Sequence, residues 1–205
     1  MPEITSTYQM LALAALFGYL LGSIPFGMVI ARVMGLGNLR EIGSGNIGAT
    51  NVLRTGNKLA AALTVIFDIG KGAVPVLIAR AYIGEDAAQI AGLAAFLGHL
   101  YPIWLRFRGG KGVATFMGVL LALYWPLGLA SLATWLFFVL VTRISSLGAL
   151  GAAAMAPMWM LLMQHGEMLV LGAVFTIFIY VRHAANITRI RAGTEPKVGS
   201  KNSAP

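Results

Sequence analysis

The sequence contains no cysteine among its 205 residues. Disulfides, thiolate nucleophiles and cysteine-ligated metals are therefore excluded. Charged residues are also scarce, at 11% of the chain, whereas a typical soluble domain carries roughly 25%. Seven acidic residues and three histidines offer few ligands for a metal ion. We predict neither a metal site nor a cofactor.

Apolar residues dominate what is present, at 58% of the chain, with a mean hydropathy of +0.80. So little polar material cannot cover a globule in water, so lipid is the expected second solvent. Several apolar stretches approach the roughly 20 residues that cross a bilayer as a helix. We predict an all-α, polytopic membrane helix bundle of about seven transmembrane helices. The stretches cover residues 8–34, 59–82, 88–105, 113–127, 128–142, 147–163 and 167–182.

The loops between these stretches predict the orientation of the chain. Basic residues follow the first, third, fifth and seventh stretches, whereas Glu85, Asp86 and Glu167 lie in the alternate loops. Basic residues mark the cytoplasmic side of a membrane protein. We expect the N-terminus outside and the C-terminus in the cytoplasm. The protein would be a multi-pass protein of the cell inner (plasma) membrane, with its active site on the cytoplasmic face.

The same asymmetry accounts for the net charge of +8 without nucleic acid as a partner. We predict a single transmembrane domain over residues 1–192, in contact with membrane lipid, and expect a monomer. Residues 193–205 are polar and are predicted to form a disordered cytoplasmic tail.

The first loop is rich in glycine and small polar residues. Residues 43–51 read Gly-Ser-Gly-Asn-Ile-Gly-Ala-Thr-Asn, and Arg54 follows. The string fits G-x-G-x-x-G, but no strand precedes it and no βαβ unit fits, so a dinucleotide-binding fold is not indicated. Its glycines can turn backbone N–H groups inward as an anion nest, and Arg54 adds a fork for phosphate. The alternative is a flexible turn with helix-capping side chains.

A second loop, within residues 98–115, contains Gly109-Gly-Lys-Gly112. It lacks the Ser or Thr that follows the lysine in a Walker A motif. Exposed backbone amides beside the Lys111 ammonium would still bind an anion, and a basic helix cap is an equally good interpretation. His99 lies one turn before Pro102, where it either satisfies a carbonyl freed by that proline or takes part in chemistry.

A third polar cluster follows the last apolar stretch, at residues 182–191. If the helix continues, His183 and Asn186 share a face at i, i+3 spacing. The alternative is a basic helix end that contacts anionic headgroups. Ser146, after the fifth stretch, reads first as a helix cap.

Two ionisable residues lie inside the second apolar stretch. Asp68 and Lys71 are at i, i+3, where a carboxylate and an ammonium pair. Such residues within a membrane are functional by default, but a pair that neutralises itself favours a structural role here.

Three phosphate signals on one predicted face are stronger together than apart. A helix bundle can bring the ends of its first, third, fifth and seventh helices together, pooling Arg54, Lys111 and His183. Such a site could hold two phosphates, or one phosphate and one carbonyl. Nothing in the sequence resembles a Ser-His-Asp triad.

Residues 43–51 with Arg54, residues 98–115 and residues 182–197 together resemble the bacterial acyl-phosphate:glycerol-3-phosphate acyltransferase family. Residues 68–72, Asp-Ile-Gly-Lys-Gly, match a further family segment. The resemblance runs in order to about residue 197. Ala184 and Ala185 depart from it, because longer polar residues are usual there, and Arg108 replaces the usual lysine.

The resemblance implies transfer of a fatty acyl group from acyl phosphate to the sn-1 hydroxyl of glycerol 3-phosphate, which gives lysophosphatidic acid and phosphate. It implies glycerol 3-phosphate contacts from six residues and an acyl-phosphate nest from four. The six are Ser44, Arg54, Lys111, Ser146, His183 and Asn186, and the four are Gly45, Asn46, Gly48 and Thr50. Of these, His183, Lys111 and Arg54 would be catalytic.

His183 is the one plausible side-chain base, but a phosphate oxygen of the substrate can equally take the hydroxyl proton and is slightly favoured. A small-anion membrane transporter is the alternative function. It predicts inverted repeats with matching breaks, which the sequence does not contain.

Overall fold

A computed structural model describes residues 2–199, and within them the regular structure is helical, with no β-strand. The all-α prediction is therefore confirmed for this part of the chain. The helices are α1 (Tyr8–Gly22), α2 (Phe26–Val33), α3 (Ala49–Val52), η1 (Leu53–Thr55), α4 (Lys58–Tyr82), α5 (Glu85–Leu100), η2 (Ile103–Leu105), α6 (Val113–Leu123), α7 (Trp125–Thr142), α8 (Ser145–Leu162), η3 (Gly166–Met168), α9 (Leu169–Arg182) and α10 (Ala184–Arg191).

Each of the seven apolar stretches corresponds to helix, but not every one is long enough to cross a bilayer. Within residues 2–199, five spans meet the length and hydropathy that crossing requires: Tyr8–Val33, Lys58–Tyr82, Glu85–Leu105, Trp125–Thr142 and Ser145–Leu162. A sixth results if Gly166–Arg182 and Ala184–Arg191, bent by 64°, are one broken span. The predicted number of seven is not confirmed.

The remaining apolar helix, α6, has 11 residues. At 1.5 Å per residue it is about 16 Å long, against about 30 Å for the hydrocarbon core of a bilayer. Its apolar character favours a membrane-spanning helix, whereas its length is too short to cross the hydrocarbon core.

The chain divides into two compact units, residues 2–128 (the N-terminal unit) and residues from 129 onward, described to 199 (the C-terminal unit). The single domain over residues 1–192 stays a prediction.

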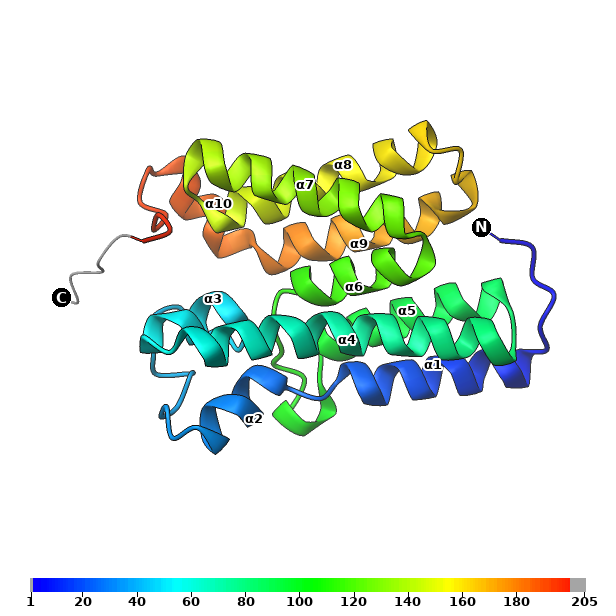
Figure 1. The fold of residues 1–205 in the computed structure, drawn as a ribbon, viewed down its shortest axis with the longest axis horizontal. Coiled ribbons are helices and arrows are strands. Elements are labelled where there is room, and N and C mark those ends of the chain that lie inside the picture. The colour runs from blue at the N-terminus through cyan, green and yellow to red at the C-terminus, as the bar shows by residue number, and fades with distance from the viewer. Residues whose placement is uncertain (1, 200–205) are drawn as a thin grey trace. The chain divides into compact units, whose positions relative to one another are not determined.

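In the N-terminal unit, α1 and α5 lie side by side (Figure 1) and pack through small residues. A Cβ at Gly18 would lie 2.3 Å from the Ala91 carbonyl oxygen, and one at Gly22 would lie 2.1 Å from that of Ala95. Both pairs repeat at a spacing of four residues, which is the small-residue pattern that lets membrane helices approach closely. The apolar sequence of α1 alone would not have identified this face.

The chain breaks between α1 and α2, at residues 23–25. Pro25 has no N–H and cannot continue the ladder of α1. Ser23 closes α1 instead, through its N–H to the Tyr19 carbonyl at 2.8 Å.

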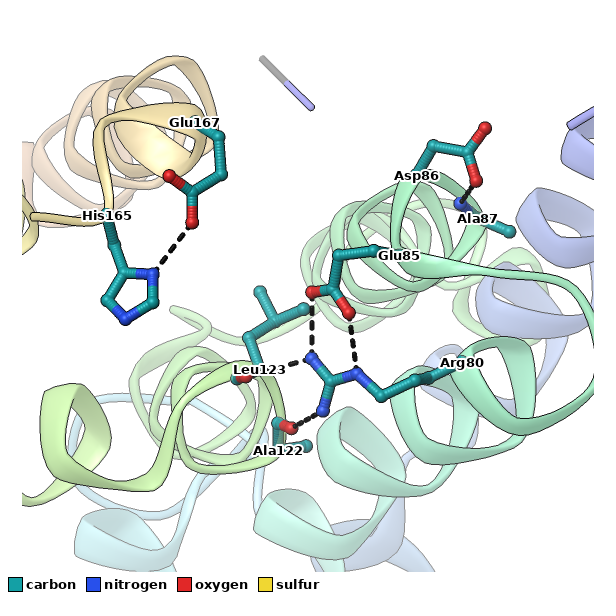
Figure 2. Close-up of polar contacts among 8 residues, drawn as sticks. All are labelled: Arg80, Glu85, Asp86, Ala87, Ala122, Leu123, His165 and Glu167. Carbon is teal, nitrogen blue, oxygen red and sulfur yellow. Dashed lines mark hydrogen bonds and ion pairs between the residues drawn. The ribbon is translucent and has the colours of Figure 1, made fainter. Parts of the chain in front are cut away.

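Helix α4 packs against α6 and also donates hydrogen bonds to the C-terminal end of α6. A Cβ at Gly72 would lie 2.4 Å from the Thr115 carbonyl oxygen, so the two backbones nearly touch. Near the C-terminal end of α4, the Arg80 guanidinium donates to the carbonyls of Ala122 and Leu123 and to the Glu85 carboxylate (Figure 2). These bonds satisfy two of the carbonyls that the C-terminus of a helix leaves unpaired.

At the N-terminal end of α5, Asp86 is 3% exposed and collects donors from the start of the chain. Its carboxylate accepts from the N–H of Thr5 at 3.0 Å and of Ser6 at 2.8 Å, and from Ala87, as Figure 2 shows in part. This contact attaches the extended residues that precede α1 to the start of α5.

In the C-terminal unit, α8 packs against α7 at Gly148 and Gly151 and against α9 at Gly172, with a few polar contacts besides. Trp159 of α8 donates its Nε1–H to the Thr134 hydroxyl of α7 at 3.0 Å. The Thr176 hydroxyl of α9 donates to the Ala153 carbonyl of α8 at 2.7 Å. Between α8 and α9, His165 pairs with Glu167 at 2.7 Å (Figure 2).

Candidate functional site

Asn51 organises the first glycine-rich loop, residues 43–51. Its Oδ1 accepts from the Ser44 N–H at 3.1 Å and lies 3.3 Å from the Ser44 hydroxyl. Its Nδ2 donates to the carbonyls of Leu39, at 2.9 Å, and Asn46, at 2.8 Å. The side chain is 2% exposed. The loop is thus a hydrogen-bonded structure built on one buried amide.

Arg54 lies in η1, against the start of this loop. A Cβ at Gly43 would meet the Arg54 Cδ and Nη1 at 2.6 Å and the Asn51 Oδ1 at 2.8 Å. Gly43 has a φ of 53°, so it is required here both for its backbone conformation and for space. Asn51 and Gly43 therefore bring Ser44 and Arg54 to the same end of the loop, and their role in binding stays a prediction.

The four residues predicted as an acyl-phosphate nest lie in the same loop and the first turn of α3. Gly45 has a left-handed φ of 65°, and its N–H donates to the Ile42 carbonyl at 2.9 Å. The Asn46 Oδ1 accepts from the next N–H, that of Ile47, at 2.9 Å. Gly48 precedes α3, and Thr50 is exposed on it. The internal bond of Gly45 takes one of the amides that a nest would use.

The second glycine-rich loop, residues 109–112, differs from the prediction. Its first two amides are not exposed, because the Gly109 N–H donates to the Leu100 carbonyl at 3.0 Å and the Gly110 N–H to the His99 carbonyl at 3.1 Å. Both glycines are buried. The exposed anion nest was wrong for these two amides, which fold the loop back on the end of α5. The half-buried Lys111 remains the group of this loop with the charge to bind an anion.

The predicted pairing of Asp68 with Lys71 is confirmed. Lys71 Nζ lies 2.7 Å from Asp68 Oδ1, and both side chains are buried. His99 Nδ1 lies 3.7 Å from the same oxygen. His99 thus belongs to a buried polar cluster in the N-terminal unit.

In the C-terminal unit, His183 lies at the bend between α9 and α10 and is 3% exposed. Its Nδ1 is 2.8 Å from the Ile179 carbonyl oxygen. Because a carbonyl only accepts, Nδ1 carries the proton and the lone pair of a neutral ring lies on Nε2. This is the tautomer that a general base at Nε2 needs.

Ser146 and Asn186 meet on one carboxylate, that of Glu195. Glu195 Oε1 accepts from the Ser146 hydroxyl at 2.6 Å and from the Asn186 Nδ2 at 2.5 Å. Arg189 Nε donates to Oε2 at 2.7 Å. The structure therefore brings Ser146 and Asn186 together, with Glu195 as the shared acceptor.

Sequence reasoning did not assign a role to Glu195. Burial disfavours its charged form, but the hydrogen bonds from Ser146, Asn186 and Arg189, with the charge of Arg189, outweigh burial and lower its pKa. The signal was an isolated acid after a strongly basic helix end. Glu195 belongs to the tail predicted to be disordered, as does Val198, whose N–H donates to the Arg143 carbonyl at 2.7 Å. Residues 200–205 of that tail lie outside the described residues.

Comparison with known proteins gives the family. The glycerol-3-phosphate acyltransferase family matches residues 12–193. A glycerol-3-phosphate acyltransferase of Cereibacter sphaeroides is 62% identical over 99% of this chain and 97% of its own length. One of Ruegeria pomeroyi is 61% identical over 99% of this chain and its whole length.

Two solved structures are also similar. One is the glycerol 3-phosphate form of an integral membrane glycerol 3-phosphate acyltransferase, with 40% identity and a TM-score of 0.87 over 92% of this chain and 96% of the other. The lysophosphatidic acid form gives 38% identity and a TM-score of 0.83, over 92% and 95%. With its several apolar helices, this chain is an integral membrane protein and belongs to the glycerol-3-phosphate acyltransferase family.

Proposed function

We propose that this protein transfers a fatty acyl group from acyl phosphate to the sn-1 hydroxyl of glycerol 3-phosphate. The products are lysophosphatidic acid and inorganic phosphate. Membership of the glycerol-3-phosphate acyltransferase family supports glycerol 3-phosphate as the acceptor substrate. The Ser44–Asn51–Arg54 arrangement supports anion binding, because it sets a hydroxyl and a guanidinium beside a glycine-rich backbone.

The donor follows from the chemistry that the residues can perform. Acyl phosphate is a mixed anhydride with a good leaving group, so its carbonyl can be attacked directly by the substrate hydroxyl. The new ester C–O bond forms, the bond between the acyl carbon and the phosphate oxygen breaks, and phosphate leaves with the bonding pair. This route needs no cysteine nucleophile, and the sequence has none. Transfer requires that two anions be held close, which costs repulsion unless cations offset it.

We assign the residues of each unit in these terms. In the N-terminal unit, Ser44, Arg54 and Lys111 would contact the phosphate of glycerol 3-phosphate. Backbone around Gly45, Asn46, Gly48 and Thr50 would contact the acyl-phosphate group, although the Gly45 N–H already has an internal acceptor.

In the C-terminal unit, Ser146, His183 and Asn186 would contact glycerol 3-phosphate. The proton of the attacking hydroxyl passes either to His183 Nε2 or to a phosphate oxygen of the substrate. The second route is slightly favoured, because the substrate itself then supplies the base. Ser146 and Asn186 each share Glu195, and this fixes the direction in which their polar groups point.

The setting is part of the proposal. The acyl chain would lie among apolar helices while the phosphates lie at the cytoplasmic face of the inner membrane. The N-terminus would be outside, the C-terminus in the cytoplasm, and the active unit a monomer.

The test is acyl transfer by the purified protein in lipid, supplied with glycerol 3-phosphate and a long-chain acyl phosphate. Phosphate release should require glycerol 3-phosphate and should equal the lysophosphatidic acid formed. Arg54→Ala and Lys111→Ala should each reduce turnover at least about a hundredfold, as for lost transition-state contacts of charged groups. Glu41→Gln, an exposed change, is the control.

A folded protein without turnover that instead carries phosphate across liposomes would reject the enzyme in favour of an anion transporter. Near-normal turnover in both alanine variants would leave the reaction standing and reject the assigned residues.

A further inference from the structure

The N-terminal unit buries three ionisable side chains that the proposed reaction does not use. Asp68, Lys71 and His99 are 3%, 3% and 4% exposed. Lys71 Nζ lies 2.7 Å and His99 Nδ1 lies 3.7 Å from the same oxygen, Asp68 Oδ1. An ion pair of this kind adds little net stability over apolar packing, since desolvation offsets the attraction. The role of these three groups is therefore better judged from the segments that they contact than from their contribution to stability.

Lys71 connects this cluster to the first glycine-rich loop. Its ammonium donates at 2.8 Å to the carbonyl of Ile24, at the break between α1 and α2, and lies 5.8 Å from the Phe26 ring centroid. The next residue, Gly27, touches the loop, because a Cβ there would lie 2.0 Å from the Ile47 carbonyl oxygen. Lys71 thus fixes the start of α2, and α2 begins directly against the loop that holds Ser44.

His99 connects the same cluster to the second glycine-rich loop. Its Nδ1 faces Asp68, and its Nε2 lies where a Cβ on Gly110 would come within 2.1 Å. The His99 carbonyl also accepts the Gly110 N–H at 3.1 Å. The imidazole is thus packed between Asp68 and the residue that precedes Lys111.

A second bridge joins the two loops on the exposed side. Arg40 donates through Nη1 to the Gly45 carbonyl at 3.1 Å and through Nη2 to the Arg108 carbonyl. One carbonyl belongs to the first loop, and the other directly precedes the second. The two loops are therefore linked through Arg40 at the surface and through Asp68 in the interior.

We propose that Asp68 and Arg40 are positioning residues that hold the two glycine-rich loops, and with them Ser44 and Lys111, at one fixed separation. This inference rests on the proposed function, because both loops are assigned there to substrate. Two anionic substrates react only when they are aligned, and a displacement of about 1 Å can cost on the order of a hundredfold in rate. Neither Asp68 nor Arg40 needs to touch substrate for this effect.

The test measures the separation of the loops apart from activity. The chain has no cysteine, so Glu41→Cys and Phe107→Cys place two spin labels at exposed positions beside the two loops. Distances between the labels are measured in lipid nanodiscs. Kinetics are measured on the cysteine-free protein, together with the thermal unfolding midpoint.

Two changes are compared. Asp68→Leu with Lys71→Met replaces the ion pair by apolar side chains, which avoids leaving one buried charge alone. Arg40→Ala removes the exposed bridge, and it keeps the test open if the buried double variant fails to fold. Glu85→Gln, in the ion pair with Arg80 near the C-terminal end of α4, is the matched control.

Each of the two changes should broaden the distance distribution and lower kcat at least about tenfold, while the KM for glycerol 3-phosphate changes less than kcat. Glu85→Gln should alter neither distance nor rate. An unchanged distance, or a broadened distance with normal kcat, overturns the proposal. A wild-type protein without acyl transfer rejects the proposed function, whereas the distance measurement still decides whether these residues fix the loops.

Discussion

Single polar side chains determine the form of the candidate site. Asn51 makes contacts to three other residues of the chain around the first loop, and Glu195 gathers three donors in the C-terminal unit. In both cases one buried side chain holds several groups of the site together through hydrogen bonds. Loss of such a group leaves its former partners buried and unpaired, which costs more than the bond itself contributes.

Asn51→Asp tests this at the first loop. The carboxylate can still accept from Ser44, but the carbonyls of Leu39 and Asn46 lose their donor. We expect acyl transfer to fall at least about tenfold, since unsatisfied buried groups cost roughly 1–3 kcal/mol each. Asn57→Asp is the control, because Asn57 only caps α4 through its Oδ1 and aspartate caps equally well. Equal activity of the two variants would reject the role of Asn51.

His183→Gln separates binding from proton transfer. If a phosphate oxygen of the substrate is the base, the KM for glycerol 3-phosphate should rise about tenfold, as for a lost hydrogen bond to a charged group, with kcat within about threefold. Steady-state kinetics with acyl phosphate saturating give both constants. A collapse of kcat at unchanged KM would instead make His183 Nε2 the base.

At the scale of the helices, glycine position decides which helices can touch. Gly70 and Gly72 lie two residues apart on α4. A Cβ at Gly70 meets nothing within 4 Å, whereas one at Gly72 meets the Thr115 carbonyl at 2.4 Å. Glycine is therefore dispensable at position 70 and required at position 72, on a different face of the same helix.

Gly70→Ala and Gly72→Ala should consequently have opposite effects. Alanine at position 70 should stabilise by roughly 0.5–1 kcal/mol, because it restricts the unfolded backbone. Alanine at position 72 should force α4 and α6 apart and lower the thermal unfolding midpoint. Fluorescence-detected unfolding in detergent measures both. A neutral Gly72→Ala would mean that the helices separate without cost.

Glu195 gives the contact between α10, α8 and the following segment a dependence on pH. Since its pKa is lowered in the folded protein, its contribution to stability is complete above the unfolded value of about 4.3. That contribution is lost as the pH falls through the folded pKa. The unfolding midpoints of the wild type and Glu195→Gln should therefore differ at pH 7, and the difference should shrink as the pH falls below about 4.3 towards the lowered folded pKa. A constant difference across this range would contradict the assignment.

Hydropathy predicted much of the helix order, because it depends on local sequence. The second stretch is an example, because it was predicted over residues 59–82 and α4 covers Lys58–Tyr82. The break at residues 23–25 was missed inside one long apolar stretch, although Pro25 marks it. The resemblance to the family supplied the candidate residues.

The contacts among those residues could not be predicted in the same way. The inward amides of Gly109 and Gly110 and the donors around Glu195 depend on which segments pack together. Spacing along the chain carries no such information. The count of seven spans is not confirmed for a different reason. Hydropathy records how apolar a segment is, but it records neither the 11-residue length of α6 nor the bend between α9 and α10.

At the scale of the whole molecule, the predicted orientation can be tested with single cysteines. Gly166→Cys adds a side chain where nothing lies within 4 Å, and Lys58→Cys lies at an exposed position on the predicted cytoplasmic side. A membrane-impermeant maleimide added to intact cells should label position 166 and spare position 58 until the membrane is opened. The reverse pattern would invert the topology.

The length of α6 has a consequence for how the chain enters the membrane. A nascent chain is presented to the insertion machinery in order, and a helix of about 16 Å cannot by itself keep both ends in water. Its C-terminal carbonyls at Ala122 and Leu123 find their donor in Arg80 of α4, a helix made earlier. We therefore expect the segment that carries Lys111 to depend on packing of α6 against α4, where Gly72 meets the Thr115 carbonyl, rather than on membrane insertion of α6 by itself.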